Sequence, residues 1–185
     1  ETFILAPRSR TRDANGDWAV RQQNVLWDAK ATAVIVCDMW DLHHCKNAVG
    51  RVGEMAPRMN QLLNTARARG AFIIHAPSSC MEFYKNHPAR KRAQAAPGAA
   101  VQPKAIESWC HWIDKVEESQ GYPIDHSNGG EDDDPAEHAA WASHLAKLGR
   151  NPGSPWKRQV ALIGIDPRRD AISDSGIEIW NLLEA

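Results

Sequence analysis

The chain contains 185 residues, of which 43% are hydrophobic and 24% are charged, and its formal net charge is −1. This length and composition are typical of a globular domain with a substantial core. The balanced charge argues against a nucleic-acid-binding module, and no run approaches the ~18 apolar residues that a membrane span needs. We therefore expect no nucleic acid and no membrane as partners. Because the sequence begins with Glu1 rather than Met, it leaves the compartment open, with a cytoplasmic location slightly favoured.

Residues 1–30 form the first predicted unit, an arm that lies over a domain formed by residues 31–185. The arm mixes Arg, Asp, Asn and Gly residues with two tryptophans, Trp18 and Trp27. Large rings with one polar atom often hold a peripheral segment against a core. We therefore expect the two tryptophans to anchor the arm.

The apolar, β-branched run from Ala33 to Trp40 predicts the first strand of the domain, covered on both faces. Asp38 lies near the end of this run, so its carboxylate is predicted to lie at the mouth of a buried strand, where α/β enzymes place their chemistry. The alternative is that Asp38 caps the next helix or stabilises a turn. The polar loop that follows brings His43 and His44 close to the same mouth.

Residues 54–70 predict a helix, because apolar residues recur at helical spacing and Gly70 provides a stop. The apolar run 71–77 predicts a second strand. Together these elements form a β-α-β unit, whose strands should be parallel and whose crossover should be right-handed. The carboxyl ends of the two strands then lie side by side, and the loop at 78–88, which contains Tyr84, overhangs the same crevice as Asp38.

Residues 88–156 are predicted to form an insertion, because they are rich in Ala and Pro, lack a clear pattern and are too long for a plain connection. A short helix is expected within it at 137–148. The aromatic residues of the insertion fit two roles equally well, a lid over the crevice or a subunit contact.

The run 159–165 predicts the third strand, and a helix follows after Asp174 or Ser175, either of which can cap it. This helix is expected to carry Ile179, Leu182 and Leu183 inward. Three strands would leave a sheet edge that normally needs covering. We therefore expect the sequence to be the amino-terminal part of something larger.

The cysteines lack the paired spacing of a zinc ribbon and do not indicate a disulfide framework. They are Cys37, Cys45, Cys80 and Cys110. Cys45 follows two histidines, so a local pair with His43 or His44 as the base is a third-ranked route to nucleophilic catalysis. The same residues, with the carboxylates of Asp38 and Asp41, also suit zinc in their chemistry. Adjacent side chains rarely converge on one ion, however, and we expect no metal site.

Three segments resemble the isochorismatase-like cysteine hydrolases, the superfamily that includes nicotinamidases. They are the VIVCDMWD run at 34–41, the strand at 71–76, and DAISDSGIEIWNLL at 170–183. The resemblance covers roughly residues 28–80 and 156–185. It implies a Rossmann-like, three-layer α/β/α fold with a parallel sheet, and an Asp, Lys and Cys triad that attacks amide or related bonds. Asp38 falls on the family aspartate, which would act as general base for the cysteine thiol.

Two features depart from the family pattern. Arg168 or Arg169 stands near the position of the family lysine, and arginine keeps the charge but does not readily give up a proton. The nucleophilic cysteine belongs at the start of the helix after a fourth strand, beyond Ala185, and none of the four cysteines matches it. This chain alone is therefore expected to be inactive. The Asp-x-His metal motif of some relatives is also missing after the second strand.

We therefore expect a hydrolase of a small amide-like or ester-like substrate, with Asp38 as general base and Arg168 as the neighbouring cation. The expected substrate-binding residues are Trp40, His43, His44 and Tyr84. The expected partners are a small-molecule substrate and either the remainder of the protein or a second chain that completes the sheet. We also expect a homo-oligomer and no cofactor. The alternative is a noncatalytic relative that binds a ligand or partner through its aromatic insertion, which the arginines at 168–169 favour.

Overall fold

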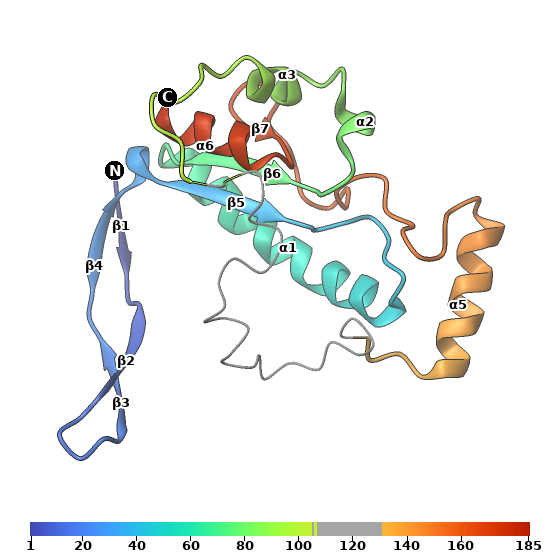
Figure 1. The fold of residues 1–185 in the computed structure, drawn as a ribbon, viewed down its shortest axis with the longest axis horizontal. Helices are drawn as coiled ribbons and strands as arrows, with labels where there is room; N and C mark the ends of the chain where they lie inside the picture. The colour runs from blue at the N-terminus through green and yellow to red at the C-terminus, as the bar shows by residue number, and fades with distance from the viewer. Residues whose placement is uncertain (105, 107–130) are drawn as a thin grey trace.

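The computed structural model describes residues 1–104, 106 and 131–185. At its centre, β5 (Ala33–Cys37), β6 (Phe72–Ala76) and β7 (Ala171–Ile172) form a parallel sheet in the order β5-β6-β7. Helices flank this sheet (Figure 1), so the mixed α/β character expected from the sequence is confirmed. None of the helices in the described ranges is long and apolar enough to cross a membrane.

The β5-α1-β6 unit contains the parallel strand pair predicted from the sequence. Val34 lies opposite Ile73 in this pair, and α1 (Lys46–Ala68) connects the two strands. Leu63 of α1 is fully buried against the sheet, in the same cluster as Ile73. The chain turns after α1 at Gly70, whose φ of +95° is a conformation that residues with side chains rarely adopt. The predicted stop at Gly70 is confirmed.

α1 begins at Lys46, well before the predicted start at residue 54. Its first amides donate to the carboxylate of Asp133, with Lys46 N 2.6 Å from Oδ2 and Asn47 N 2.9 Å from Oδ1. Cys45 is the local N-cap, with its Sγ atom accepting from the Ala48 amide at 3.4 Å. The acceptor for the first two amides comes from a residue 87 positions away in the sequence, and local sequence patterns carry no sign of such a partner.

The third strand lies in a different place from the predicted one. Residues 159–165 form turns and loop, in which the Val160 amide donates to the Met39 carbonyl. The apolar side chain that packs inward from this segment is Ile163, which is buried in the core beside α1. The strand that joins β6 is β7, only two residues long.

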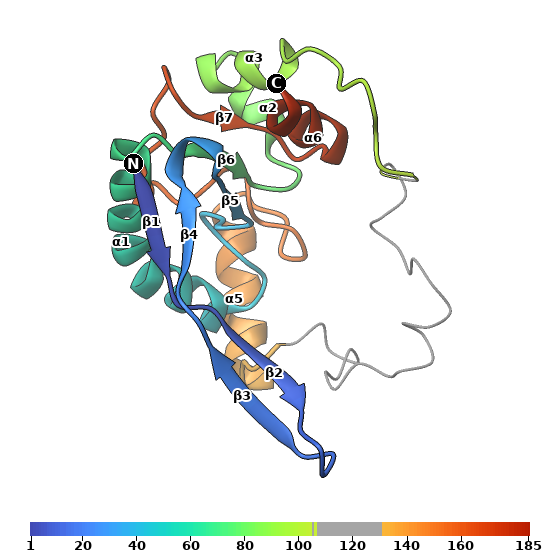
Figure 2. The ribbon, with the colours of Figure 1, turned by 90° about the vertical axis from the view of Figure 1, so that its left-hand side faces the viewer.

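α3 (Pro88–Gln94) and α6 (Gly176–Glu184) cover the face of the sheet opposite α1 (Figures 1 and 2). Ile74 of β6, Ala171 of β7 and Ala93 of α3 are buried together on this face. α3 therefore packs directly on the sheet, although it begins the segment predicted to be a surface insertion.

α6 begins as predicted after Ser175, whose hydroxyl accepts a hydrogen bond from the Glu178 amide at 3.4 Å. Ile179 and Leu182 pack against the sheet, as expected. Leu183 is 45% exposed, so its predicted inward position is wrong. The helix therefore uses a narrower apolar stripe than its composition suggests.

The arm is a long antiparallel ribbon that projects from the sheet (Figures 1 and 2). β1 (Thr2–Leu5) pairs with β4 (Val25–Asp28), and β2 (Arg8–Arg12) pairs with β3 (Trp18–Gln22). Trp18 is 59% exposed and Trp27 is 51% exposed, so the prediction that the tryptophans anchor the arm is wrong. Phe3 at the base of the ribbon packs against the core instead.

Two further helices lie between the sheet strands in sequence. α2 (Met81–Tyr84) is a single turn after β6, and α5 (Pro135–Lys147) confirms the helix predicted at 137–148. Asp134 caps α5, accepting from the Ala136 amide at 2.9 Å. Residues 107–130 of the predicted insertion, including Cys110, lie outside the described residues.

Candidate functional site

Asp38 lies directly after β5, at the carboxyl edge of the sheet, as predicted. Its backbone has φ +49°, and that of Ser79 has φ +61°. Among the described residues, these two are the ones other than glycine with positive φ. The Oδ1 atom of Asp38 accepts a hydrogen bond from the Ser78 amide at 2.9 Å, which joins the loop after β5 to the loop after β6.

Asp174 brings a second carboxylate to the same edge, because it follows β7. Its Oδ2 atom accepts from the Ser79 amide at 2.9 Å. Two carboxylates from different strand ends therefore bind consecutive amides of one strained loop. Both side chains are exposed, and neither forms an ion pair with any residue in the described part of the chain.

An aromatic wall stands beside these carboxylates. We use this name for Trp40, His43, His44 and Trp156. The Trp40 indole donates to the Ser78 carbonyl at 3.1 Å and stacks on Trp156, with centroids 4.3 Å apart and planes at 11°. The wall therefore contacts the same loop as Asp38. Burial, followed by the neighbouring His44, lowers the pKa of His43. The structure thus brings Trp40, His43 and His44 together, and their contact with a substrate stays a prediction.

Tyr84 does not join the aromatic wall as an exposed pocket residue. It is buried with Cys80 and Ile172, and its hydroxyl accepts from the Gln159 amide at 3.0 Å. Burial raises the pKa of Tyr84. This side chain therefore holds the 159–165 segment against α2, and the expectation that it lines the crevice is corrected.

Arg168 lies far from the position that the family resemblance implied. Because the third strand is β7 and not 159–165, Arg168 and Arg169 precede the strand and lie towards its amino end, whereas Asp38 follows β5. Arg168 is exposed, and Arg169 forms an ion pair with Asp166 at 2.8 Å. In a parallel sheet these positions are at opposite edges, so Arg168 is not the cation beside Asp38.

None of the described cysteines has the environment of an activated nucleophile, which needs a lowered pKa. Burial raises the pKa of Cys37 and of Cys45. Burial also raises the pKa of Cys80 to about 12, with further contributions from Asp41, Asp174 and Asp38. These three thiols are therefore protonated at neutral pH.

Among the described residues, Cys45, Asp132 and Asp133 could chemically hold a metal, and their ligand atoms lie within 4.8 Å of one another. Their carboxylates already have partners, because Asp133 caps α1 and Asp132 binds Arg51 at 2.7 Å. Asp41, weighed from the sequence as a ligand beside Cys45, instead accepts from the Lys157 amide at 3.0 Å. The sequence grouping of Asp38, Asp41, His43, His44 and Cys45 therefore does not converge on one point.

No family model, no curated protein and no solved structure matches this chain.

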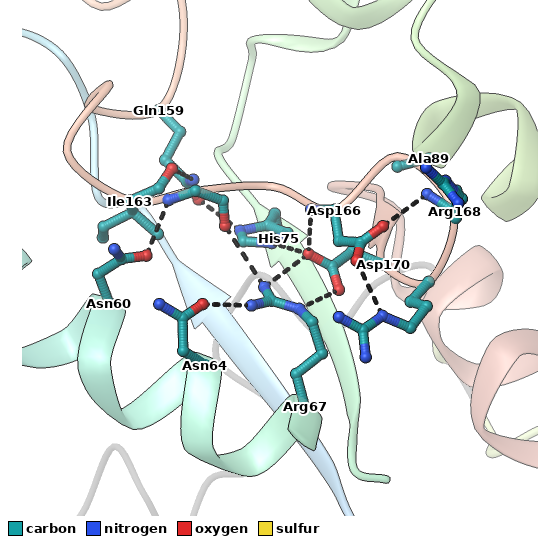
Figure 3. Close-up of polar contacts among 12 residues, drawn as sticks. Asn60, Asn64, Arg67, His75, Ala89, Gln159, Ile163, Asp166, Arg168 and Asp170 are labelled. Atoms are coloured by element: carbon teal, nitrogen blue, oxygen red, sulfur yellow. Dashed lines mark hydrogen bonds and ion pairs between the residues drawn. The ribbon is translucent and has the colours of Figure 1, made fainter. Parts of the chain in front are cut away.

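A second polar group lies inside the protein, between α1 and the sheet (Figure 3). The Asp170 carboxylate accepts from Arg67 Nε at 2.8 Å and Nη2 at 2.7 Å, and His75 Nε2 lies 3.1 Å from it. His75 Nδ1 lies 2.9 Å from Gln159 Oε1. Burial alone would raise the pKa of Asp170, but the hydrogen bonds from His75 and Arg67 outweigh it and hold the pKa at about 2.

Sequence reasoning missed this buried group, and it named Asp174 only as a helix cap. Two signals were present. His75 is a lone polar residue in an apolar strand, and Asp170 directly precedes β7. A polar residue in such a strand needs a buried partner, so the pair could have been sought among charged residues next to strands.

Proposed function

We propose that the protein is a hydrolase of small amide-like or ester-like substrates and that its substrate binds at the carboxyl edge of β5, β6 and β7. One observation carries the proposal. The two strained non-glycine residues, Asp38 and Ser79, both lie at that edge. The Asp38 carboxylate accepts from the Ser78 amide, and the Ser79 amide donates to the Asp174 carboxylate. Such strain persists only where its surroundings enforce it, and it gathers at functional sites. Open parallel sheets also bind ligands at this edge.

Asp38 fits the role of general base. Its Oδ1 atom is held by the Ser78 amide, which fixes the carboxylate orientation, and within the described residues its Oδ2 atom has no hydrogen-bond partner. A carboxylate that is held by one oxygen and open at the other can accept a proton from a nucleophile or a water molecule. The aromatic wall beside it would hold the apolar or planar part of a substrate.

The nucleophile of this proposal lies outside the described residues. Cys37, Cys45 and Cys80 all have raised pKa values, and such thiols are poor nucleophiles. The family resemblance places the reactive cysteine on a helix after a fourth strand. We therefore propose that this thiol comes from a further part of the same protein or from a second chain.

The deciding experiment compares Asp38→Asn with Asp17→Asn in the full-length protein, using a panel of small amides and esters. Asparagine keeps the oxygen that accepts from the Ser78 amide but cannot act as a base, so hydrolysis should fall by about 10²-fold or more. Asp17 is an exposed aspartate in the turn of the arm, and its replacement should leave the rate unchanged. Equal rates for the two variants would contradict the role of Asp38. Ligand binding without turnover by the unmodified protein would support the noncatalytic alternative.

A further inference from the structure

His75 is fully buried in β6, and each of its two ring nitrogens faces an oxygen atom (Figure 3). Nδ1 lies 2.9 Å from Gln159 Oε1, and Nε2 lies 3.1 Å from Asp170 Oδ2. A neutral imidazole has one N–H group and one lone pair, so it can satisfy only one of these two acceptors.

The orientation of the Gln159 amide is fixed by its other contact. Its Nε2 atom donates to the Ile163 carbonyl at 3.2 Å, which leaves Oε1 to face His75. Turning the amide round would bring its oxygen against the Ile163 carbonyl oxygen. Gln159 is therefore an acceptor towards His75 Nδ1, and this nitrogen must carry a proton.

The Asp170 carboxylate is equally an acceptor. It receives both Arg67 donors, and its Oδ2 atom also accepts from the Asp166 amide at 2.7 Å. Each of these contacts brings a donor to the carboxylate, so Asp170 acts as an acceptor and has no proton to give to His75. His75 Nε2 must therefore carry a proton as well.

Charged groups from each neighbouring element act on this ring. Arg67 from α1, Arg92 from α3 and His87 before α3 disfavour a second proton on His75, whereas Asp170 favours it at direct contact. Asp166, the other acidic residue nearby, is held by Arg169. Asp170 contacts the ring directly, and Gln159 Oε1 supplies the second acceptor that a doubly protonated ring needs.

We propose that His75 is a buried imidazolium and a positioning residue, which ties both ends of the 159–170 segment to β6 and so sets the place of β7. Gln159 begins this segment and Asp170 ends it, directly before the two-residue strand. The Ser173 amide after β7 also donates to the His75 carbonyl, at 3.0 Å. Asp174, one of the two carboxylates of the candidate site, follows Ser173. An effect of His75 on that site rests on the proposed function, whereas the protonation state of His75 does not.

Long-range ¹H–¹⁵N correlation spectra of the ¹⁵N-labelled full-length protein at neutral pH test the proposal directly. Both ring nitrogens of His75 should show the chemical shifts of protonated nitrogens. The signals are identified by their loss in His75→Gln. His87 is an internal control, because its Nδ1 atom accepts from the Ala89 amide and should appear unprotonated. An unprotonated shift at either nitrogen of His75 would overturn the proposal.

A second variant tests the cause of the double protonation. In Asp170→Asn, the amide can present an N–H group to Nε2, so this nitrogen should become unprotonated while Nδ1 keeps its proton. A ring that stays doubly protonated in this variant would show that Asp170 does not hold the second proton, contrary to the proposal. If Asp170→Asn does not fold, Gln159→Met tests the other acceptor, and Nδ1 is expected to lose its proton. An Nδ1 atom that stays protonated in Gln159→Met would show that the Gln159 oxygen does not hold this proton, contrary to the proposal.

Discussion

Asp38 and Ser79 both adopt a left-handed backbone, which costs a residue with a side chain about 1–2 kcal/mol. Their contributions to the site differ. Asp38 supplies a carboxylate, whereas Ser79 supplies its backbone amide to Asp174. The side chain of Ser79 is therefore dispensable for the contact, and its backbone conformation is the feature that matters.

Ser79→Gly should stabilise the protein by up to about 1 kcal/mol, because glycine adopts positive φ without strain while losing more backbone entropy on folding. Urea denaturation of both proteins measures the difference in the free energy of unfolding. Ser78→Gly is the matched control, since Ser78 has no positive φ and should lose stability. A loss of stability in Ser79→Gly would show that the loop is not strained.

Asp170 should make the stability of the protein depend on pH at the acid end. Its pKa is about 2 in the folded state, below the value of about 4 for an unfolded chain, so its contribution is present above pH ~4 and is lost as the pH falls towards 2. Asp170→Asn should lower stability at neutral pH by about 3 kcal/mol or more, because Arg67 and His75 then lack their buried partner.

Urea denaturation at a series of acid pH values checks both parts of this prediction. The unmodified protein should lose stability steeply below pH ~4, and the Asp170→Asn variant should show a flatter profile over the same range. Parallel profiles for the two proteins would show that Asp170 is not responsible for the acid loss.

α1 shows, at the scale of an element, which features local sequence can predict. α1 ends at Ala68, and the predicted stop at Gly70 follows from a local conformational need, the positive φ that glycine adopts there. Its start combines a local cap, Cys45, with Asp133, which accepts from the first two amides and which no periodicity near residue 46 reveals. Helix ends set by tertiary contacts are therefore the part that sequence patterns miss.

Removal of the distant cap should free the first turn of α1. Asp133→Ala is expected to cost about 1–2 kcal/mol, since two helix amides lose their acceptor. Hydrogen exchange at residues 46–49 should accelerate more than exchange elsewhere in α1. Asp134→Ala removes the cap of α5 and should accelerate exchange in that helix alone. Unchanged exchange at 46–49 in Asp133→Ala would contradict the assignment of the cap.

β7 is an element that local sequence patterns did not predict. The run at 159–165 has the composition of a strand, yet it forms turns and loop. Ile163 packs in the core and Gln159 Oε1 lies against His75, whereas Leu162 is 54% exposed. The true strand is defined by Asp170 and the pairing of two residues with β6. Because the third strand was predicted at 159–165, Arg168 was expected at the carboxyl edge, whereas it precedes β7 and lies at the opposite end of the sheet. The position of Asp38 was predicted correctly because its strand was predicted correctly. An error in one strand thus propagates to every site residue that is counted from it.

At the scale of the whole molecule, β5 is an edge strand in the described sheet, and Ile35 is 41% exposed on it. An apolar groove of about 570 Å³ lies between the base of the arm and β5, lined by residues that include Phe3, Trp27 and Leu62. Exposed apolar edges are prone to pair with another strand. The completion of the sheet by a further strand or chain stays a prediction.

The arm should be the first part of the molecule that trypsin removes. Every residue of β2 is exposed, including Arg8, Arg10 and Arg12, and a two-stranded ribbon without a third strand is marginally stable in water. Mass spectrometry after brief digestion should find cleavage within residues 8–21 while the sheet stays intact. Initial cleavage within α1 would show that the arm is the more protected part.

The distant cap of α1 also has a consequence for synthesis on the ribosome. Lys46 precedes Asp133 by 87 residues, so at ~5–20 residues per second the helix waits roughly 4–17 seconds for the residue that caps it. The last strand, β7, is made later still. During this interval the nascent chain holds β5, α1 and β6 without the distant acceptor at the helix start and with both sheet edges unpaired.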